Sequence, residues 1–223
     1  MPKNFPMQIH YISEDNSILN HFLAQLRDVT VQKDSMRFRR NMQRIGEIMA
    51  YEISKTLTYT PAPIITPLGI KDTEVIKDGI VICSVLRAGL ALHDGFTSFF
   101  DDAGNGFISA FRHHPNNDDT FTIVVQYKAA PQLTGKIVIL ADPMLATGQS
   151  LVAVFNKLLE NEVPKEIHIA VVIAAPEGIA FLEENLPGNC HLWIADEDNH
   201  LNEKQYIVPG LGDAGDLAYG IKL

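Results

Sequence analysis

The chain has 223 residues, of which 46% are hydrophobic and 20% charged, and its formal net charge is −9. This length is typical of one α/β domain with additions, and this composition excludes a mostly disordered protein. We find neither a leader-like start nor an apolar run approaching the ~20 residues that a membrane-spanning helix needs. The acidic balance argues against a nucleic acid as the partner, because such binding depends on neutralising phosphates.

The two cysteines give a further indication. Cys83 and Cys190 each lie inside an apolar run, and they lack the spacing of a metal site. We therefore expect two reduced thiols in the core of a cytoplasmic protein rather than a disulfide or a zinc site.

Residues 1–60 show the spacing of helices. Asp34 or Ser35 is placed to cap the second helix, and Pro61 and Pro63 are expected to close this region. Apolar residues recur at three- and four-residue steps in two stripes, first Ile18, Phe22 and Leu26, then Phe38, Met42, Ile45 and Met49.

Four arginines crowd the second of these helices. They are Arg37, Arg39, Arg40 and Arg44. Our first interpretation is a solvated helix face or a contact between copies of the chain, and our second is a phosphate or effector site.

After residue 60 the pattern changes to short apolar runs that alternate with helical stretches. The continuous apolar character of the runs favours strands covered on both faces, as in a parallel sheet. Strands are predicted at 79–84, 121–127, 136–141, 167–174 and 190–195, helices at 89–100, 149–161 and 177–185, and a hairpin at 64–76. The fold class expected is α/β: a doubly wound, mostly parallel sheet flanked by helices.

We expect one domain over residues 1–223. Its parts are a helical segment at 1–60, an α/β core at 61–200 and a small C-terminal hood at 201–223.

The segment Lys136 to Glu160 is the most informative part of the chain. A predicted buried strand ends at Asp142, a short loop carries Thr147 to Ser150, and a helix follows. Backbone N–H groups and hydroxyls at a helix N-terminus favour an anion such as a phosphate. The alternative is an ordinary helix capped by Thr or Ser. The loop lacks the residues of a P-loop and the spaced glycines of a dinucleotide fold, and the acid beside it suits a phosphorylated sugar.

Two other segments point to the same kind of ligand. Arg87 follows another predicted strand, and its planar guanidinium suits diphosphate oxygens. The segment Tyr206–Asp216 contains three glycines, a proline and two aspartates. We interpret it as a shaped loop whose backbone reads the edge of a planar base, with a purely structural turn as the alternative.

Together these segments resemble the uracil phosphoribosyltransferase family. The stretch DPMLATGQS at 142–150 is similar to the family's phosphoribosyl-pyrophosphate motif, VLRAGL at 85–90 to its pyrophosphate segment, and YIVPGLGDAGD at 206–216 to its uracil loop. Shorter matches are RFR at 37–39, AAPEGI at 174–179 and LNE at 201–203.

The resemblance implies a reaction in which uracil and phosphoribosyl pyrophosphate give UMP and diphosphate, with Mg²⁺ held mainly through the substrate. The sugar carbon would pass through an oxocarbenium-like state. The family also implies a homodimer or larger homo-oligomer, which we expect to form through the N-terminal helices, and GTP as a candidate effector. Two alternatives stay open, a regulatory RNA-binding protein of the same fold and a phosphoribosyltransferase for another base.

The resemblance also implies roles for individual residues. Arg87, Arg112 and Asp213 would form the catalytic set, with Arg112 on a flexible hairpin arm at about 107–127 that closes over the diphosphate. The loop that binds phosphoribosyl pyrophosphate would comprise Asp142 at the ribose hydroxyls, then Pro143, Met144, Leu145, Ala146, Thr147, Gly148, Gln149 and Ser150. Uracil would be bound by Ile207, Gly212, Asp213 and Ala214.

The residue at position 149 and the histidines lead to two further expectations. Gln149 stands where the family usually has a glycine, and it would be strained if that position needs a positive φ. The eight histidines indicate no metal site, since their spacing suits exposed turn residues.

Overall fold

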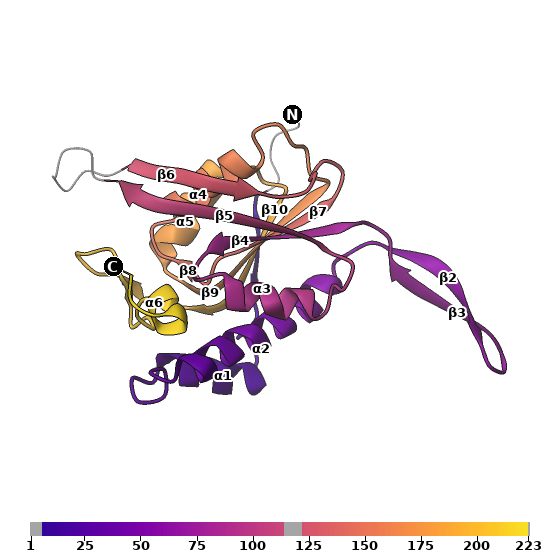
Figure 1. Ribbon diagram of the computed structural model, residues 1–223, viewed down its shortest axis with the longest axis horizontal. Helices are drawn as coiled ribbons and strands as arrows, with labels where there is room; N and C mark the ends of the chain where they lie inside the picture. The colour runs from indigo at the N-terminus through magenta and orange to yellow at the C-terminus, as the bar shows by residue number, and fades with distance from the viewer. Residues whose placement is uncertain (1–5, 114–121, 223) are drawn as a thin grey trace.

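A computed structural model of the chain describes residues 6–113 and 122–222, and it is built around one twisted sheet (Figure 1). Neighbouring strands run parallel except the last pair, β5 and β6, which is antiparallel. In spatial order the strands are β1 (Gln8–Tyr11), β10 (Cys190–Glu197), β9 (Glu166–Ala174), β7 (Ile137–Ala141), β4 (Ile80–Leu86), β5 (Gly104–His113) and β6 (Thr122–Ala129), and the short β8 (Met144–Leu145) pairs with β9.

Helices cover both faces of the sheet, which confirms the predicted α/β class. One face packs against α1 (Ile18–Arg27), α2 (Ser35–Ser54) and α3 (Leu90–Thr97), and the other against α4 (Gln149–Leu158) and α5 (Pro176–Asn185). Alternate residues of each central strand therefore enter two separate cores, as expected for a strand buried on both sides. In β4, for example, Ile82 joins the first core and Cys83 the second.

The thiols of Cys83 and Cys190 are both buried, and burial raises the pKa of each to about 12. The prediction of two protected core thiols is confirmed. None of the described helices is long and apolar enough to cross a bilayer.

The N-terminal part differs from the predicted pattern in three respects. Residues Gln8–Tyr11 form an edge strand, β1, which the helical reading of this part missed. In α1 the buried residues are Leu19, Leu23 and Leu26. The predicted stripe is therefore confirmed at Leu26 and in part at Phe22, which packs against the core, and is wrong at Ile18, which is 61% exposed. The helix α2 ends at Ser54, before the two prolines. Its cap, the Asp34 side chain, and its buried stripe are as predicted.

A two-stranded hairpin extends away from the body of the molecule (Figure 1). It consists of β2 (Tyr59–Thr66) and β3 (Gly69–Ile76), so it begins five residues before the predicted hairpin at 64–76. Pro61 and Pro63 lie inside β2 rather than at the end of a helical region. Both strands of a two-stranded hairpin are edge strands, so a proline, which lacks an N–H, is tolerated where that N–H would face solvent.

The C-terminal hood forms beside α1 and α2 from β11 (His200–Leu201), β12 (Ile207–Val208) and α6 (Ala214–Tyr219). A guanidinium holds it in place, because Arg27 donates to Asp198 Oδ2 at 2.9 Å and to the Gly210 carbonyl at 3.0 Å. Gln32 donates to the Leu211 carbonyl at 3.1 Å. The loop between β12 and α6 is therefore fixed from the N-terminal helices.

Two glycines allow α2 and α3 to touch. A Cβ on Gly95 would lie 2.2 Å from the Gln43 carbonyl, and one on Gly46 would lie 2.6 Å from the Leu92 carbonyl. No side chain larger than hydrogen fits either position without moving a helix.

Candidate active site

A cleft of about 560 Å³ opens at the carboxyl ends of β4 and β7, under the hood. This is the position where open α/β sheets bind ligands. Three segments that are distant in sequence meet there: the end of β4 with Arg87, the loop after β7 with Asp142, and the loop of the hood with Asp213. The hairpin arm adds Ala110. The predicted site residues among its lining are Arg87, Asp142, Met144, Ala146, Ser150, Gly212, Asp213 and Ala214.

Arg87 lies immediately after β4 and extends to the hood. Its guanidinium donates to Asp216 Oδ1 at 2.8 Å and to the Gly220 carbonyl at 3.1 Å. Its side chain stays 36% exposed, so part of the fork faces the cleft. A guanidinium held in this way can offer its remaining N–H groups to an anionic ligand with little loss of side-chain entropy.

Asp142 lies directly after β7 and accepts a hydrogen bond from the Met144 N–H at 3.3 Å. Burial raises the pKa of its carboxyl to about 7. A carboxyl with a perturbed pKa in a cleft is a recurrent mark of a functional site. Ribose hydroxyls or a cation would supply the partners that the ionised form lacks.

The α4 N-terminus supports an anion site. Gly148 has φ +76° and precedes the first helical residue, Gln149, and no side chain caps the helix. The alternative of an ordinary helix capped by Thr147 or Ser150 is therefore wrong, and the first N–H groups remain available for a ligand. The expected strain at Gln149 is absent, because the positive φ falls on Gly148.

The hood supplies the third side of the cleft. Asp213 caps α6 by accepting from the Asp216 N–H at 2.9 Å, and its second oxygen lies 3.5 Å from Lys222 Nζ. The preceding loop turns at Gly210 and Gly212, both with positive φ, which directs its backbone toward the cleft.

Other predicted residues lie near the cleft without lining it. Pro143 and Leu145 are buried beneath the loop, and Ile207 is buried in β12. Thr147, Gly148 and Gln149 belong to the loop and the helix start but are not among the lining residues. The backbone of Arg112 pairs with Ile123 across the antiparallel arm, as predicted for a hairpin, and its side chain falls outside the described part.

Sequence reasoning missed several residues of this region. Lys204 and Gln205 line the cleft beside Tyr206, the first residue of the predicted base-reading loop, and Arg27 with Asp198 holds the hood. The bond between Arg27 and Asp198 spans 171 positions, so no local pattern could have shown it. Gln205 has φ +62°, which no residue pattern in the chain signalled.

A family model described as "Uracil phosphoribosyltransferase" matches residues 12–221. The chain belongs to the uracil phosphoribosyltransferase family. A relative from Porphyromonas gingivalis with that name is 46% identical over 217 residues, which cover 97% of this chain and 100% of that protein. One from Pyrococcus furiosus is 38% identical, covering 94% of this chain and 89% of that protein.

A solved structure from Aquifex aeolicus superposes with a TM-score of 0.85 and 30% identity, covering 97% of this chain and all of that one. The fold predicted from the strand and helix pattern is therefore shared with a solved structure over nearly the whole chain. As a uracil phosphoribosyltransferase family member the chain is an enzyme, a phosphoribosyltransferase, as the three cleft segments indicated.

Proposed function

We propose that the cleft transfers the phosphoribosyl group of phosphoribosyl pyrophosphate to uracil, giving UMP and diphosphate. The observation that carries this proposal is the convergence of Arg87, the loop before α4 and Asp213 on one cleft. The family resemblance assigns these three segments to the diphosphate, the 5-phosphate and the base. These segments are far apart in the sequence. They can bind one pair of substrates only because the fold places them around the same cleft.

In the proposed reaction the bond from the anomeric carbon to the diphosphate oxygen breaks, a bond to uracil N1 forms, and N1 loses its proton. The uncapped start of α4 would hold the 5-phosphate, and Arg87 would take part of the charge of the leaving diphosphate. Asp213 would lie between base and sugar, and Arg112 would reach the diphosphate from the arm. Holding both substrates in line supplies much of the rate.

Magnesium fits the donors of the cleft. The carboxylates among its lining residues are Asp142 and Asp213, and hard oxygen donors of this kind suit Mg²⁺. Two carboxylates do not make a complete protein cage, which is consistent with an ion held mainly through substrate oxygens and water. When bound, the ion would offset the negative charge of the diphosphate.

The test is an assay of diphosphate release with Mg²⁺, phosphoribosyl pyrophosphate and one free base at a time. We expect turnover with uracil to exceed that with a purine or with orotate by at least a hundredfold. A preference for another base would overturn the assignment of the loop at 206–216. No release with any base, at micromolar enzyme, would overturn the proposed reaction altogether.

We propose also that the enzyme is a homo-oligomer. The hairpin that extends from the body bears exposed apolar side chains, and a soluble monomer rarely maintains such a cluster. Ile65, Leu68 and Ile70 are the most exposed of them, at 86%, 100% and 73%. The N-terminal helices, where we expected the contact, add Ile18 and Tyr51. Light scattering should give a multiple of 24.7 kDa, and Ile65→Asp with Leu68→Asp should reduce it.

Two further proposals concern regulation and location. GTP stays a predicted effector, which an assay with and without GTP checks directly. A cytoplasmic location is consistent with the two buried free thiols.

A further inference from the structure

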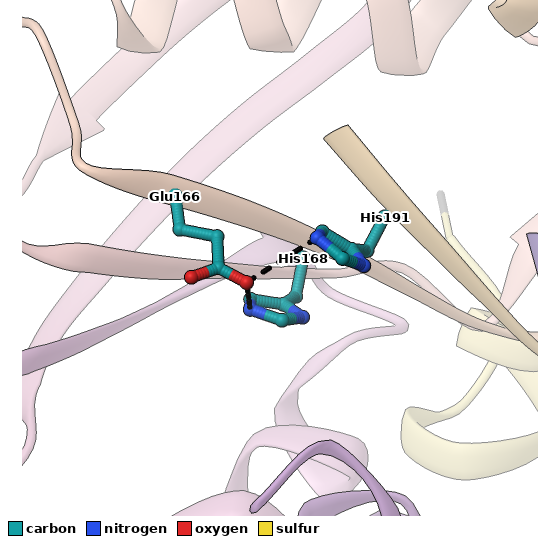
Figure 2. A group of neighbouring side chains, drawn as sticks. All are labelled: Glu166, His168 and His191. Atoms are coloured by element: carbon teal, nitrogen blue, oxygen red, sulfur yellow. Dashed lines mark ion pairs between the residues drawn. The ribbon is translucent and has the colours of Figure 1, made fainter. Parts of the chain in front are cut away.

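Glu166, His168 and His191 gather beside one another (Figure 2). They lie at the amino ends of β9 and β10, at the other end of the sheet from the cleft. Glu166 and His168 are two residues apart on one strand, so their side chains share a face. His191 is the register partner of His168 on the neighbouring strand. The expectation that the histidines are exposed turn residues is wrong here, because all three positions lie within strands and His168 is fully buried.

The spacing of the three side chains suits a metal ion. Glu166 Oε1 lies 3.1 Å from His168 Nε2 and 3.2 Å from His191 Nε2, and one donor atom from each residue lies within 4.8 Å of the others. In a tetrahedral zinc site with bonds of about 2.0–2.1 Å, donor atoms are separated by roughly 3.3 Å. Small side-chain movements would therefore bring all three onto one ion.

His168 provides a second, independent observation. Its ring is fully buried, and its Nε2 lies 3.1 Å from Glu166 Oε1 without making a well-aligned hydrogen bond in the described structure. A buried polar atom without a partner costs roughly 1–3 kcal/mol. Such an atom in a native site calls for an explanation, and an ion is one of the established explanations.

The surroundings of His191 are those of a metal ligand. Its Nδ1 lies 3.1 Å from His10 Nε2 on β1, so a proton on Nδ1 can be donated to His10 while Nε2 binds an ion. The side chains of Glu166 and His191 are 24% and 15% exposed, so an ion and a water ligand can enter.

We propose that Glu166, His168 and His191 form a binding site for one divalent transition-metal ion of the zinc type. Two imidazole nitrogens and one carboxylate are donors that Zn²⁺ prefers, whereas Mg²⁺ prefers oxygen alone. Water would complete the coordination. The ion would join β9 to β10 and have a structural effect, since the cleft lies at the other end of these strands.

Trp193 opposes this binding in a predictable way. Its indole N–H donates to His168 Nδ1 at 3.0 Å, which requires that nitrogen to accept and leaves the proton on Nε2. Metal binding needs the reverse tautomer, so the hydrogen bond from Trp193 must break. We therefore expect only micromolar affinity for zinc, and about tenfold tighter binding in Trp193→Phe.

The experiment is calorimetric titration of metal-free protein with ZnCl₂. We expect one ion per chain, at least tenfold weaker binding in Glu166→Gln and His191→Ala, and about tenfold weaker binding in His10→Phe, which removes the acceptor behind His191. The exposed His21, hydrogen-bonded to Gln25, provides the matched control, and His21→Ala should bind as the unmodified chain does.

A second readout comes from fluorescence, because Trp193 is the one tryptophan of the sequence. Its emission should change with the same midpoint as the calorimetric titration, and zinc should raise the melting temperature of the unmodified chain but not of Glu166→Gln. Absence of binding at 100 μM zinc would overturn the proposal. So would binding that Glu166→Gln and His191→Ala leave unchanged, or weaker binding in Trp193→Phe.

Discussion

The two ends of the central sheet use polar residues in opposite ways. At the carboxyl end Arg87, Asp142 and Asp213 face an open cleft, and part of their bonding capacity stays unused. At the amino end Trp193 stacks on His10 and donates a hydrogen bond to His168, so these polar side chains bond mainly to one another. In this sheet, the polar groups at the carboxyl end are separated by loops and by the hood, so they can bind a substrate. The polar groups at the amino end bond to one another instead.

The largest expected effect lies at Asp213. Asp213→Asn should lower kcat by about a hundredfold or more, because the carboxylate that we propose to lie between base and sugar would take part in proton transfer and charge stabilisation. Steady-state kinetics with uracil and phosphoribosyl pyrophosphate measures it. An unchanged kcat would mean that the Asp213 carboxylate has no part in the reaction. The carboxyl end of the sheet would then no longer be distinguished from the amino end as the catalytic site.

Arg87→Lys should raise the KM for phosphoribosyl pyrophosphate about tenfold, with a smaller change in kcat. Lysine keeps the charge but cannot contact Asp216, the Gly220 carbonyl and a diphosphate at once. The free energy of unfolding should change by less than about 1 kcal/mol, since the ion pair is partly exposed. A large loss of stability with normal KM would make Arg87 a structural residue.

We expect the ionisation of Asp142 to make the free energy of unfolding depend on pH. Its carboxyl keeps a proton in the folded enzyme up to a pKa of about 7 and loses it at 3.8 when unfolded. The folded state thus binds more protons between these values, so this group's contribution to stability falls as pH rises from about 4 to about 7 and is constant above. The difference in free energy of unfolding between the enzyme and Asp142→Asn should shift by on the order of 3 kcal/mol across that range. Urea titrations without substrate measure it, and a constant difference would contradict the raised pKa.

The smallest effect is expected at Gln149. Gln149→Gly should leave kcat and KM within about twofold, because the positive φ of the loop is at Gly148 and the Gln149 side chain is not part of the cleft lining. Stability should fall by at most about 1 kcal/mol, the usual cost of glycine in a helix. A loss of activity greater than that of Asp213→Asn would reverse our assignment of roles.

Much of the fold was predictable because the central strands are uniform. Runs such as Ile137–Ala141 and residues 169–174 are apolar on both faces, and their order with the helices defines a doubly wound sheet. The edge strand β1 was missed because four residues with polar histidine and glutamine carry no strand signal. Its pairing with β10, 183 positions away, decides its structure.

The site was predictable only to the extent that motifs are local. A predicted buried strand ends shortly before Arg87, and another ends at the segment Asp142 to Ser150. Their role in binding an anionic ligand could therefore be inferred from the sequence alone. The histidine cluster could not, because His10, His168 and His191 are separated along the chain and meet only through the strand order. Register across a sheet depends on the whole packing of the domain, which no single segment contains.

The close contact of α2 with α3 has a consequence for mutational screens. Helix α3 begins three residues after Arg87, and its approach to α2 depends on Gly46 and Gly95. A larger side chain at either position would shift α3 and carry the Arg87 turn with it. A random library selected for lost transferase activity should therefore return these two glycines beside the cleft residues, although neither lines the cleft.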